Sequence, residues 1–351
     1  MELTHQIVVL ELALPWATSR TTAPGGLRRS QVVHVALRDE RGLTGWGEAA
    51  PISRYGETAA SASNFLRTID VRRLATLRLD ESVDYLAAAG VGEMAAKCAV
   101  ETALLDLAGK QTDKPVHKLL GVAWPIARPI SYTIGIGSVE HVREQVRRAE
   151  LFQVLKLKVG GPNDEASVRA VREISPGKPM CVDANEGWRD REHALRMIEW
   201  LAADGRIEFI EQPLPARAPA ADHRWLRERS PLPLFADESC HLLADLDCVA
   251  EGFHGVNVKL MKTGGLVMAG RTLRQARRLG LQTILGCMIE SSLGIAAAFQ
   301  LSALADRLDL DSHALLANDP FEGLAVTNGC LGFAAESAAP GLGVRARNGS
   351  S

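Results

Sequence analysis

Three acidic residues stand at the ends of three consecutive short apolar runs of the chain. Asp183 ends "MCVD", Glu211 ends "IEFIE" and Asp237 follows "LFA", with spacings of 28 and then 26 residues. Each spacing fits one strand, one helix and two short loops, and the carboxyl ends of parallel strands meet at one edge of a sheet. The three side chains are therefore expected to converge. The alternative, in which each acid only caps the following helix, suits a single residue better than three in succession.

Converging carboxylates predict a metal site. Like charges held together raise carboxylate pKa values, and a bound cation removes that conflict. No suitable cysteine or histidine stands at the same strand ends, and ligands that are all oxygen favour a hard ion. We therefore expect Asp183, Glu211 and Asp237 to bind one Mg²⁺ per chain, with water and substrate oxygens completing the octahedron.

The stretch "VLKLKVGG" (residues 154–161) places Lys156 and Lys158 on one face of a predicted strand, because alternate residues of a strand point the same way. An edge strand protected by lysines is one alternative. In a barrel this strand lies beside the one that ends at Asp183, so both lysines would face the metal. Two ammonium groups about 7 Å apart repel by roughly 2.4 kcal/mol at an effective dielectric of about 20, which lowers a lysine pKa, while carboxylates oppose that effect. Lys158 is thereby a candidate base.

Lys259, in the run "GVNVKL", is expected across the barrel from Lys158, so that two amines can address opposite faces of a ligand. Lys262 is the competing candidate for this role. If the strand ends near Leu260, however, Lys262 falls in the following loop, where we expect a solvated side chain.

Eight short apolar runs that alternate with helical segments predict a parallel barrel from about residue 130 onward. Their successive starts are 24, 26, 27, 27, 21, 27 and 26 residues apart. We expect the α/β class and a modified TIM barrel of the (β/α)7β type. The predicted strands begin at Ile130, Val154, Met180, Ile207, Leu234, Gly255, Gln282 and Leu308.

The residues before the barrel predict a separate α+β capping domain. The run "HQIVVLELAL" and a hairpin that turns at Asp39 to Gly42 indicate strands, and the apolar spacing from Glu93 to Gln111 is typical of an amphipathic helix. We expect the capping domain over residues 1–120 and the barrel over residues 121–316. The segment 317–351 is expected to fold back onto the capping domain.

Composition and charge limit the kinds of molecule that the protein is expected to bind. The formal net charge is −2, which gives no reason to expect nucleic acid or an anionic membrane. The six cysteines are scattered without a CxxC pair, no apolar run reaches membrane-spanning length, and the amino terminus lacks the features of a signal peptide. A cytoplasmic protein that binds a small molecule is the expectation. No glycine-rich phosphate motif follows any predicted strand.

The motifs resemble the enolase superfamily, and within it the muconate-lactonizing-enzyme subgroup. The resemblance lies in "LKLK", "DAN", "EQP", "DES" and "NVKLMKTGG", and covers nearly the whole chain. It implies removal of a proton α to a carboxylate through an enediolate, with Mg²⁺ as cofactor. It also implies that Lys158 and Lys259 are the acid/base residues, that Lys156 contacts substrate, and that Asn185 and Glu238 support the site.

Further motifs resemble the dipeptide epimerases of that subgroup. Asp309 and Asp311 in "LDLDSHALL" resemble a pair that receives the amino group of a dipeptide, although they could instead be helix caps. Arg20, in a loop with an unusual "APGG" insertion, resembles an arginine that contacts an acidic side chain. The resemblance implies a homo-oligomeric epimerase acting on dipeptides such as L-Ala-L-Glu. An N-acylamino acid racemase, an o-succinylbenzoate synthase, a muconate-type cycloisomerase and a catalytically silent metal-binding scaffold are the alternatives.

Overall fold

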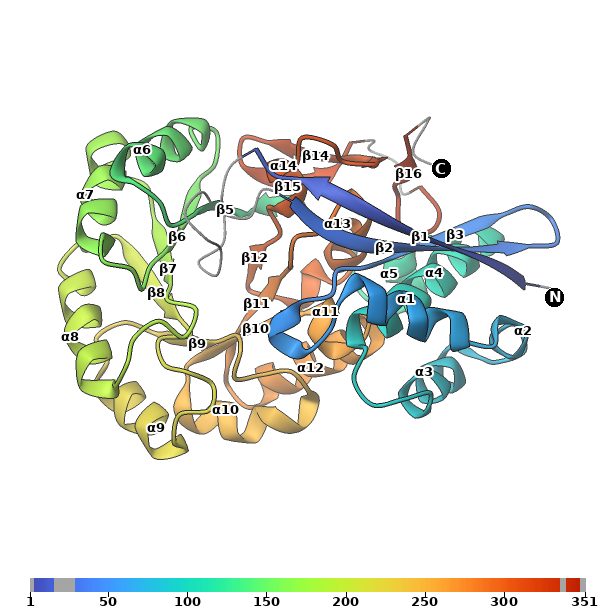
Figure 1. Cartoon of the computed structure of the whole chain (residues 1–351), viewed down its shortest axis with the longest axis horizontal. Coiled ribbons are helices and arrows are strands. Elements are labelled where there is room, and N and C mark those ends of the chain that lie inside the picture. The colour runs from blue at the N-terminus through green and yellow to red at the C-terminus, as the bar shows by residue number, and fades with distance from the viewer. Residues whose placement is uncertain (1–2, 16–28, 335–338, 348–351) are drawn as a thin grey trace.

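The computed structural model describes residues 3–15, 29–334 and 339–347. Within them, a three-stranded antiparallel sheet with its helices lies against a parallel eight-stranded barrel (Figure 1). Among the described residues, no helix combines the length and the apolar character needed to cross a membrane.

The first sheet carries its strands in the order β1-β2-β3, and the predicted hairpin is confirmed. Asp39 closes the turn, because its Oδ1 accepts hydrogen bonds from the backbone N–H groups of Arg41 (3.0 Å) and Leu43 (2.9 Å). The elements of this part are β1 (Leu3–Ala13), β2 (Arg29–Asp39), β3 (Thr44–Ala49), η1 (Ser53–Tyr55), α1 (Ala59–Thr68), α2 (Val71–Leu74), α3 (Leu79–Ala88), α4 (Met94–Thr112) and α5 (Val116–Leu119).

Helix α4 lies within one residue of its predicted bounds at each end. It is not amphipathic as predicted, because β2, β3, α1 and α11 (Leu260–Thr263) cover it on several sides. Two glycines of β3 allow the closest approach. A Cβ atom on Gly47 would lie 1.9 Å from the Ala99 oxygen, and one on Gly45 would lie 2.2 Å from the Ala103 oxygen.

The barrel confirms all eight predicted strands, each beginning within one residue of its predicted start. Their order is β5 to β12 without interruption, and a parallel bridge between Ile130 and Leu308 brings the two ends together. The strands are β5 (Ser131–Ile134), β6 (Val154–Lys158), β7 (Met180–Asp183), β8 (Ile207–Glu211), β9 (Leu234–Ala236), β10 (Gly255–Lys259), β11 (Gln282–Gly286) and β12 (Arg307–Asp309).

Seven helical crossovers join these eight strands, which confirms the (β/α)7β pattern. The crossovers contain α6 (Val139–Arg148), α7 (Asp164–Ile174), α8 (Arg191–Ala202), α9 (Ala220–Arg229), η2 with α10 (Leu243–Asp245 and Leu246–Gly252), α11 with α12 (Leu260–Thr263 and Leu266–Arg278), and α13 with η3 (Ser292–Phe299 and Ser302–Leu304). Inside the barrel, Cys181, Phe209, Phe235 and Ile284 form a small apolar cluster of their own.

The segment after the barrel contacts both parts of the molecule. Its elements are α14 (Ser312–Leu315), β13 (Phe321–Glu322), β14 (Leu324–Thr327), β15 (Cys330–Phe333) and β16 (Arg345–Ala346), and β15 pairs with β4 (Arg128–Pro129). The Leu342 N–H donates to Asp106 of α4 (2.8 Å), and the Leu342 carbonyl accepts from Gln300 beyond α13 (3.1 Å). The division of the chain after residues 120 and 316 stays a prediction.

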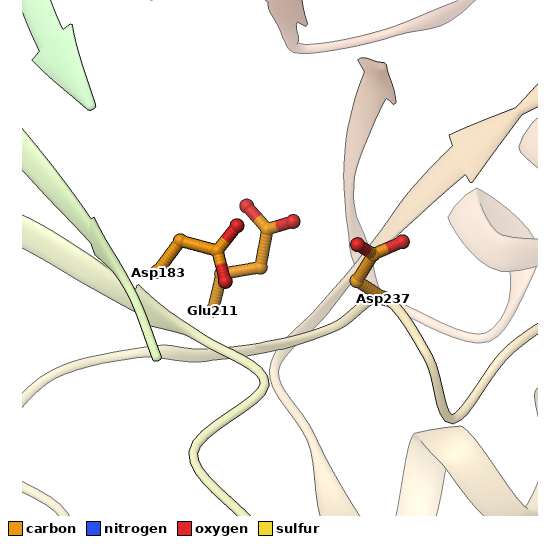
Figure 2. Close-up of side chains that lie close together, drawn as sticks. All are labelled: Asp183, Glu211 and Asp237. Atoms are coloured by element: carbon orange, nitrogen blue, oxygen red, sulfur yellow. The ribbon is translucent and has the colours of Figure 1, made fainter. Parts of the chain in front are cut away.

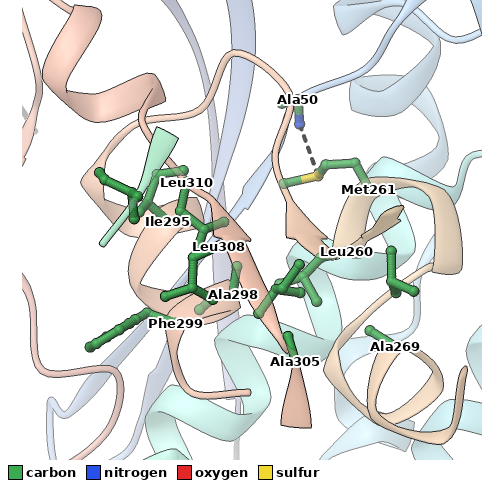
Figure 3. Close-up of a cluster of buried hydrophobic side chains, with 14 of the residues drawn as sticks. Ala50, Leu260, Met261, Ala269, Ile295, Ala298, Phe299, Ala305, Leu308 and Leu310 are labelled. Carbon is green, nitrogen blue, oxygen red and sulfur yellow. Dashed lines mark hydrogen bonds between the residues drawn. The ribbon is translucent and has the colours of Figure 1, made fainter. Parts of the chain in front are cut away.

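Apolar packing and one buried acid join the first part to the barrel. The Ala50 N–H donates to Met261 Sδ in α11 at 3.4 Å, beside a cluster of buried apolar side chains (Figure 3). Glu48 of β3 pairs with His34 (2.7 Å) and accepts hydrogen bonds from both the backbone N–H and the hydroxyl of Ser291. Burial and the Glu48 charge raise the pKa of the neighbouring Glu290 to about 8.

Replacing Gly47 with alanine should destabilise the protein, because the added methyl group meets the α4 backbone rather than a side chain that can move. We expect Gly47→Ala to lower the free energy of unfolding by about 1–3 kcal/mol in a denaturant titration. Gly177→Ala is the matched control, since a Cβ atom there meets nothing within 4 Å. Equal stability of the two variants would contradict the close contact between β3 and α4.

Candidate active site

The three predicted acids meet at the carboxyl ends of adjacent strands. Asp183 ends β7, Glu211 ends β8 and Asp237 follows β9, and each side chain is almost completely buried. One ligand oxygen of each lies within 4.8 Å of those of the other two (Figure 2). The helix-cap alternative is wrong for these three acids, since α8, α9 and η2 have Asp190, Pro219 and Leu242 at their N-cap positions.

Lys156 lies at the centre of the site and is buried. Its Nζ is 2.7 Å from Asp309 Oδ2, 2.8 Å from Glu211 Oε2 and 3.1 Å from Asp183 Oδ2. Burial lowers the pKa of Lys156, but the charges of the three carboxylates outweigh it and hold the pKa well above its usual value. Of the opposing effects expected from the sequence, the carboxylates therefore outweigh the neighbouring lysine at Lys156, because three anions contact the ammonium directly.

Lys158 and Lys259 approach the acids from opposite sides. Lys158 Nζ is 2.6 Å from Asp183 Oδ2, and Lys259 Nζ is 2.8 Å from Asp237 Oδ2. Strands β6 and β10 are four positions apart in the eight-stranded order, which is half of the way around the barrel. The structure thus places these two lysines as the sequence predicted.

The expectation that Lys262 has a solvated side chain in a loop is wrong. Lys262 lies in α11, directly after β10, but it is buried rather than solvated. Its ammonium donates to Asp237 Oδ1 (2.7 Å), to the Asp237 carbonyl (2.6 Å) and to the Asn257 carbonyl (3.0 Å). A short helix replaces the expected loop and directs the Lys262 side chain into the protein interior. There its ammonium forms an ion pair with the Asp237 carboxylate instead of facing a ligand.

The charges of the site balance one another closely. Burial raises the pKa of Asp183, but Lys158 and Lys156 outweigh it and bring the pKa down to about 2. Burial likewise opposes ionisation of Asp237, whose pKa nevertheless lies well below its usual range because of Lys259 and Lys262. Burial and the Asp183 charge raise the pKa of Glu211 to about 7. Of the three acids, Glu211 is thus the one whose pKa is raised, as expected for a carboxylate that is buried beside another carboxylate.

The donor set fits a hard divalent cation. Three carboxylates, all reached from one point between the strand ends, are the ligands that Mg²⁺ prefers, and no cysteine or histidine belongs to the group. Asp183, Glu211 and Asp237 are thus the residues that would hold the ion.

The two acids at the end of β12 differ in their surroundings. Asp309 accepts hydrogen bonds from Ser131 Oγ (2.6 Å) and from Lys156, whereas Asp311 accepts from the Thr133 N–H (2.7 Å). Burial and the Asp309 charge raise the pKa of Asp311 to about 6. Asp311 is the N-cap residue of α14, yet its side chain makes no capping hydrogen bond, so the helix-cap alternative fails for it.

The supporting residues also lie at the site. Asn185 Oδ1 accepts from Lys158 (2.8 Å), and Asn185 Nδ2 donates to Glu238 Oε1 (3.1 Å). Burial, together with the charges of Asp237 and Asp183, raises the pKa of Glu238 to about 8. Arg20 falls in the stretch 16–28, which lies outside the described residues.

A cavity of about 420 Å³ opens onto these groups. Residues of the first part, among them Ile52, Arg54 and Tyr55, line it together with the strand ends of the barrel. Lys156, Lys158, Asp237, Lys259, Asp309 and Asp311 all reach it.

Sequence reasoning missed Asn257, whose Nδ2 donates to Glu211 Oε1 at 2.9 Å. The signal was present, because Asn257 and Lys259 are two positions apart on one strand and so share a face. It also missed Ser131 and Thr133 of β5, which share a face by the same rule and hold the β12 acids. For these two residues no charge or motif drew attention.

Two family models match the chain. The model described as "Mandelate racemase / muconate lactonizing enzyme, N-terminal domain" covers residues 3–121, and the model described as "Enolase C-terminal domain-like" covers residues 139–349.

Individual proteins resemble the chain along almost its whole length. The L-Ala-D/L-amino acid epimerase of Pedosphaera parvula is 45% identical over 339 residues, which is 96% of this chain and 97% of that protein. The L-Ala-D/L-Glu epimerase of Bacteroides thetaiotaomicron is 38% identical over 93% of this chain and 82% of its own. A crystal structure of the dipeptide epimerase of Methylococcus capsulatus, complexed with Mg and L-Arg-D-Lys, superposes with a TM-score of 0.84 at 31% identity, over 98% of this chain and 99% of the other.

Truncating Lys262 should cost stability, because it removes a buried ammonium that donates to Asp237 Oδ1 and to two buried carbonyl groups, and it leaves the Asp237 carboxylate with Lys259 as its remaining lysine partner. We expect Lys262→Met to lower the free energy of unfolding by about 3–5 kcal/mol, as for other buried ion pairs that lose one partner. Lys118→Met, at an exposed lysine, is the control and should change it by less than about 0.5 kcal/mol. If the two variants unfolded alike, Lys262 would be solvated after all.

Proposed function

The chain belongs to the mandelate racemase / muconate lactonizing enzyme family of the enolase superfamily, and on that premise we propose that it is a Mg²⁺-dependent dipeptide epimerase. The observation that carries the proposal is the pair of lysines on opposite sides of one cavity, each 2.6–2.8 Å from an acid of the triad. A pair of bases facing a single carbon is what inversion of a stereocentre requires.

Lys158 and Lys259 would exchange the α-proton of the C-terminal residue. One lysine takes the proton from one face, and the other, which is still an ammonium, returns a proton to the opposite face. The reaction then runs in either direction with the two roles reversed. Lys156 is held between three carboxylates at 2.7–3.1 Å, so we assign it to pairing with the substrate and not to proton transfer.

Asp183, Glu211 and Asp237 would hold the magnesium ion. When bound, the ion supplies the positive charge that stabilises the enediolate form of the substrate carboxylate. The family relatives whose structures contain Mg and a dipeptide support this assignment.

Asp309 and Asp311 distinguish a dipeptide from an N-acylated amino acid. A buried ammonium must be paired, and two carboxylates at the end of β12 reach the cavity on the strand that lies next to β5. Asp309 already neutralises Lys156, so Asp311 supplies the additional negative charge once the amino group binds.

L-Ala-L-Glu is the substrate that we propose first, with Arg20 as the partner of an acidic side chain. The names of the Pedosphaera parvula and Bacteroides thetaiotaomicron relatives support an N-terminal alanine and differ in the second residue. Homo-oligomeric assembly and a cytoplasmic location remain part of the proposal. All six cysteines are free thiols, which agrees with that location.

The direct test is exchange of the substrate α-proton in D₂O, followed by proton NMR together with inversion at the α-carbon. The wild-type protein with Mg²⁺ should exchange and epimerise L-Ala-L-Glu and should lose both activities in excess chelator. Lys158→Ala and Lys259→Ala should each lower epimerisation by about 10²–10⁴-fold while still exchanging the proton of one epimer, a different epimer for each variant. Lys118→Ala serves as the control that changes neither activity.

Other outcomes would identify the alternatives. Exchange of N-acetyl-L-Ala-L-Glu at the rate of the free dipeptide would overturn the amino-group pocket and favour a racemase. Loss of water from a substrate would favour a synthase. Absence of exchange from every carboxylate supplied would leave the metal-binding scaffold.

A further inference from the structure

We propose that the ion pair between Arg54 and Glu186 is a clamp that fixes the position of Lys158, and that both residues are positioning residues for one half of the reaction. The inference rests on the proposed function, because it assigns the clamp to the lysine that serves one epimer. Within the described residues, neither Arg54 nor Glu186 forms a hydrogen bond or an ion pair with Asp183, Glu211 or Asp237.

The clamp joins the two parts of the molecule across the mouth of the cavity. Arg54 comes from η1 in the first part, and Glu186 comes from the loop between β7 and α8 of the barrel. The guanidinium binds the carboxylate through two parallel contacts, Nε to Oε2 at 2.9 Å and Nη2 to Oε1 at 2.8 Å. This forked geometry fixes direction as well as distance. Both side chains line the cavity.

The segment that the clamp holds is under backbone strain. Asn185 and Glu186 have φ angles of 41° and 66°, and Gln212, whose carbonyl accepts the Glu186 N–H at 2.9 Å, has a φ of 37°. Residues other than glycine occupy this left-handed region at a cost, and they stay there only where surrounding contacts hold them. Glu186 is held by Arg54 and by the Ala216 N–H, which donates to Oε1 at 2.7 Å.

Asn185 links the backbone conformation at Glu186 to the position of the Lys158 ammonium. Its Oδ1 accepts from Lys158 Nζ at 2.8 Å, and its backbone N–H donates to Asp183 Oδ1 at 2.9 Å. A rotation of the backbone at Glu186 would therefore move the acceptor that aims the Lys158 ammonium. Small displacements of a catalytic group are costly, about 100-fold in rate for about 1 Å.

Lys259 has no corresponding dependence on Glu186. Its ammonium is 2.8 Å from Asp237 Oδ2, and Lys262 holds the other oxygen of that carboxylate from below. On that side of the mouth, η1 is held by a ring contact instead, with Tyr55 and His241 edge to face at 4.3 Å between centroids. Breaking the Arg54 pair leaves this contact in place, so its effect should fall on Lys158.

The pair is only partly buried, with side-chain exposures of 49% for Arg54 and 17% for Glu186. Such pairs contribute little to global stability, because water screens them. A loss of activity in the variants without a loss of stability would therefore separate positioning from a structural role.

The experiment measures α-proton exchange of each epimer of Ala-Glu in D₂O for Arg54→Met, Glu186→Gln and the double variant. The Lys158→Ala and Lys259→Ala proteins first identify which epimer depends on Lys158. We expect both single variants to slow exchange of that epimer by on the order of three- to tenfold and to leave the other epimer within about twofold. The double variant should be no slower than the slower single variant, since both remove one interaction.

Arg191→Met is the matched control, because Arg191 forms an ion pair of similar length with Asp222 (2.9 Å, against 2.8 Å for Arg54 and Glu186) between α8 and α9 and does not line the cavity. It should change neither rate. Arg54→Lys should restore part of the exchange, since it keeps the charge but loses the fork. Equal slowing of both epimers, or normal exchange in Arg54→Met, would overturn the clamp.

A second readout does not depend on the reaction. Amide hydrogen exchange of residues 184–187, measured by mass spectrometry with Mg²⁺ present, should be faster in Arg54→Met and unchanged in Arg191→Met. Unchanged protection in Arg54→Met would overturn the clamp even if the protein epimerises dipeptides. Faster amide exchange without any α-proton exchange by the wild type would instead refute the proposed function and leave the contact between the two parts intact.

Discussion

The balance of buried charge at the carboxyl ends of β6 to β12 is the constraint on which the rest of the structure depends. Four ammonium groups lie against four carboxylates, and all of these residues except Lys158 are buried: Lys156, Lys158, Lys259 and Lys262 against Asp183, Glu211, Asp237 and Asp309. Stranding any one of these charges would cost several kcal/mol. Each buried charge therefore needs a group of opposite charge beside it, and the strands of the barrel provide these groups.

The parallel barrel meets this demand because neighbouring strands end at one rim. β7 and β8 end on an acid and β9 is followed by one, while β6 and β10 bring the lysines from either side. Below the rim, Asn257 and the apolar cluster inside the barrel fill the space without adding charge. Above it, η1 closes the mouth through Arg54 and Tyr55. The first part of the chain thus contributes lining residues to the active-site cavity.

The sequence was informative where chemistry repeats with the period of the fold. The eight strand starts and the three acids follow from that period, because one βα unit separates each from the next. The burial of Lys262 could not be predicted, since it depends on one short helix in place of a loop. The left-handed backbone at Asn185 and Glu186 was equally hidden, because contacts distant in sequence impose it, including one with Arg54, 132 positions away. The direct contact of Lys156 with Asp309 depends on the closure of the barrel across 153 positions.

The central claim is that Asp183, Glu211 and Asp237 form one cation site whose charge the surrounding lysines tune. Calorimetric titration of the wild-type protein with Mg²⁺ in the absence of substrate tests it most directly. One ion per chain should bind, and Glu211→Gln should weaken binding by at least about tenfold, as expected when one of three carboxylate ligands is neutralised. Binding that persists unchanged in Glu211→Gln, or a stoichiometry near zero in the wild type, would contradict the claim.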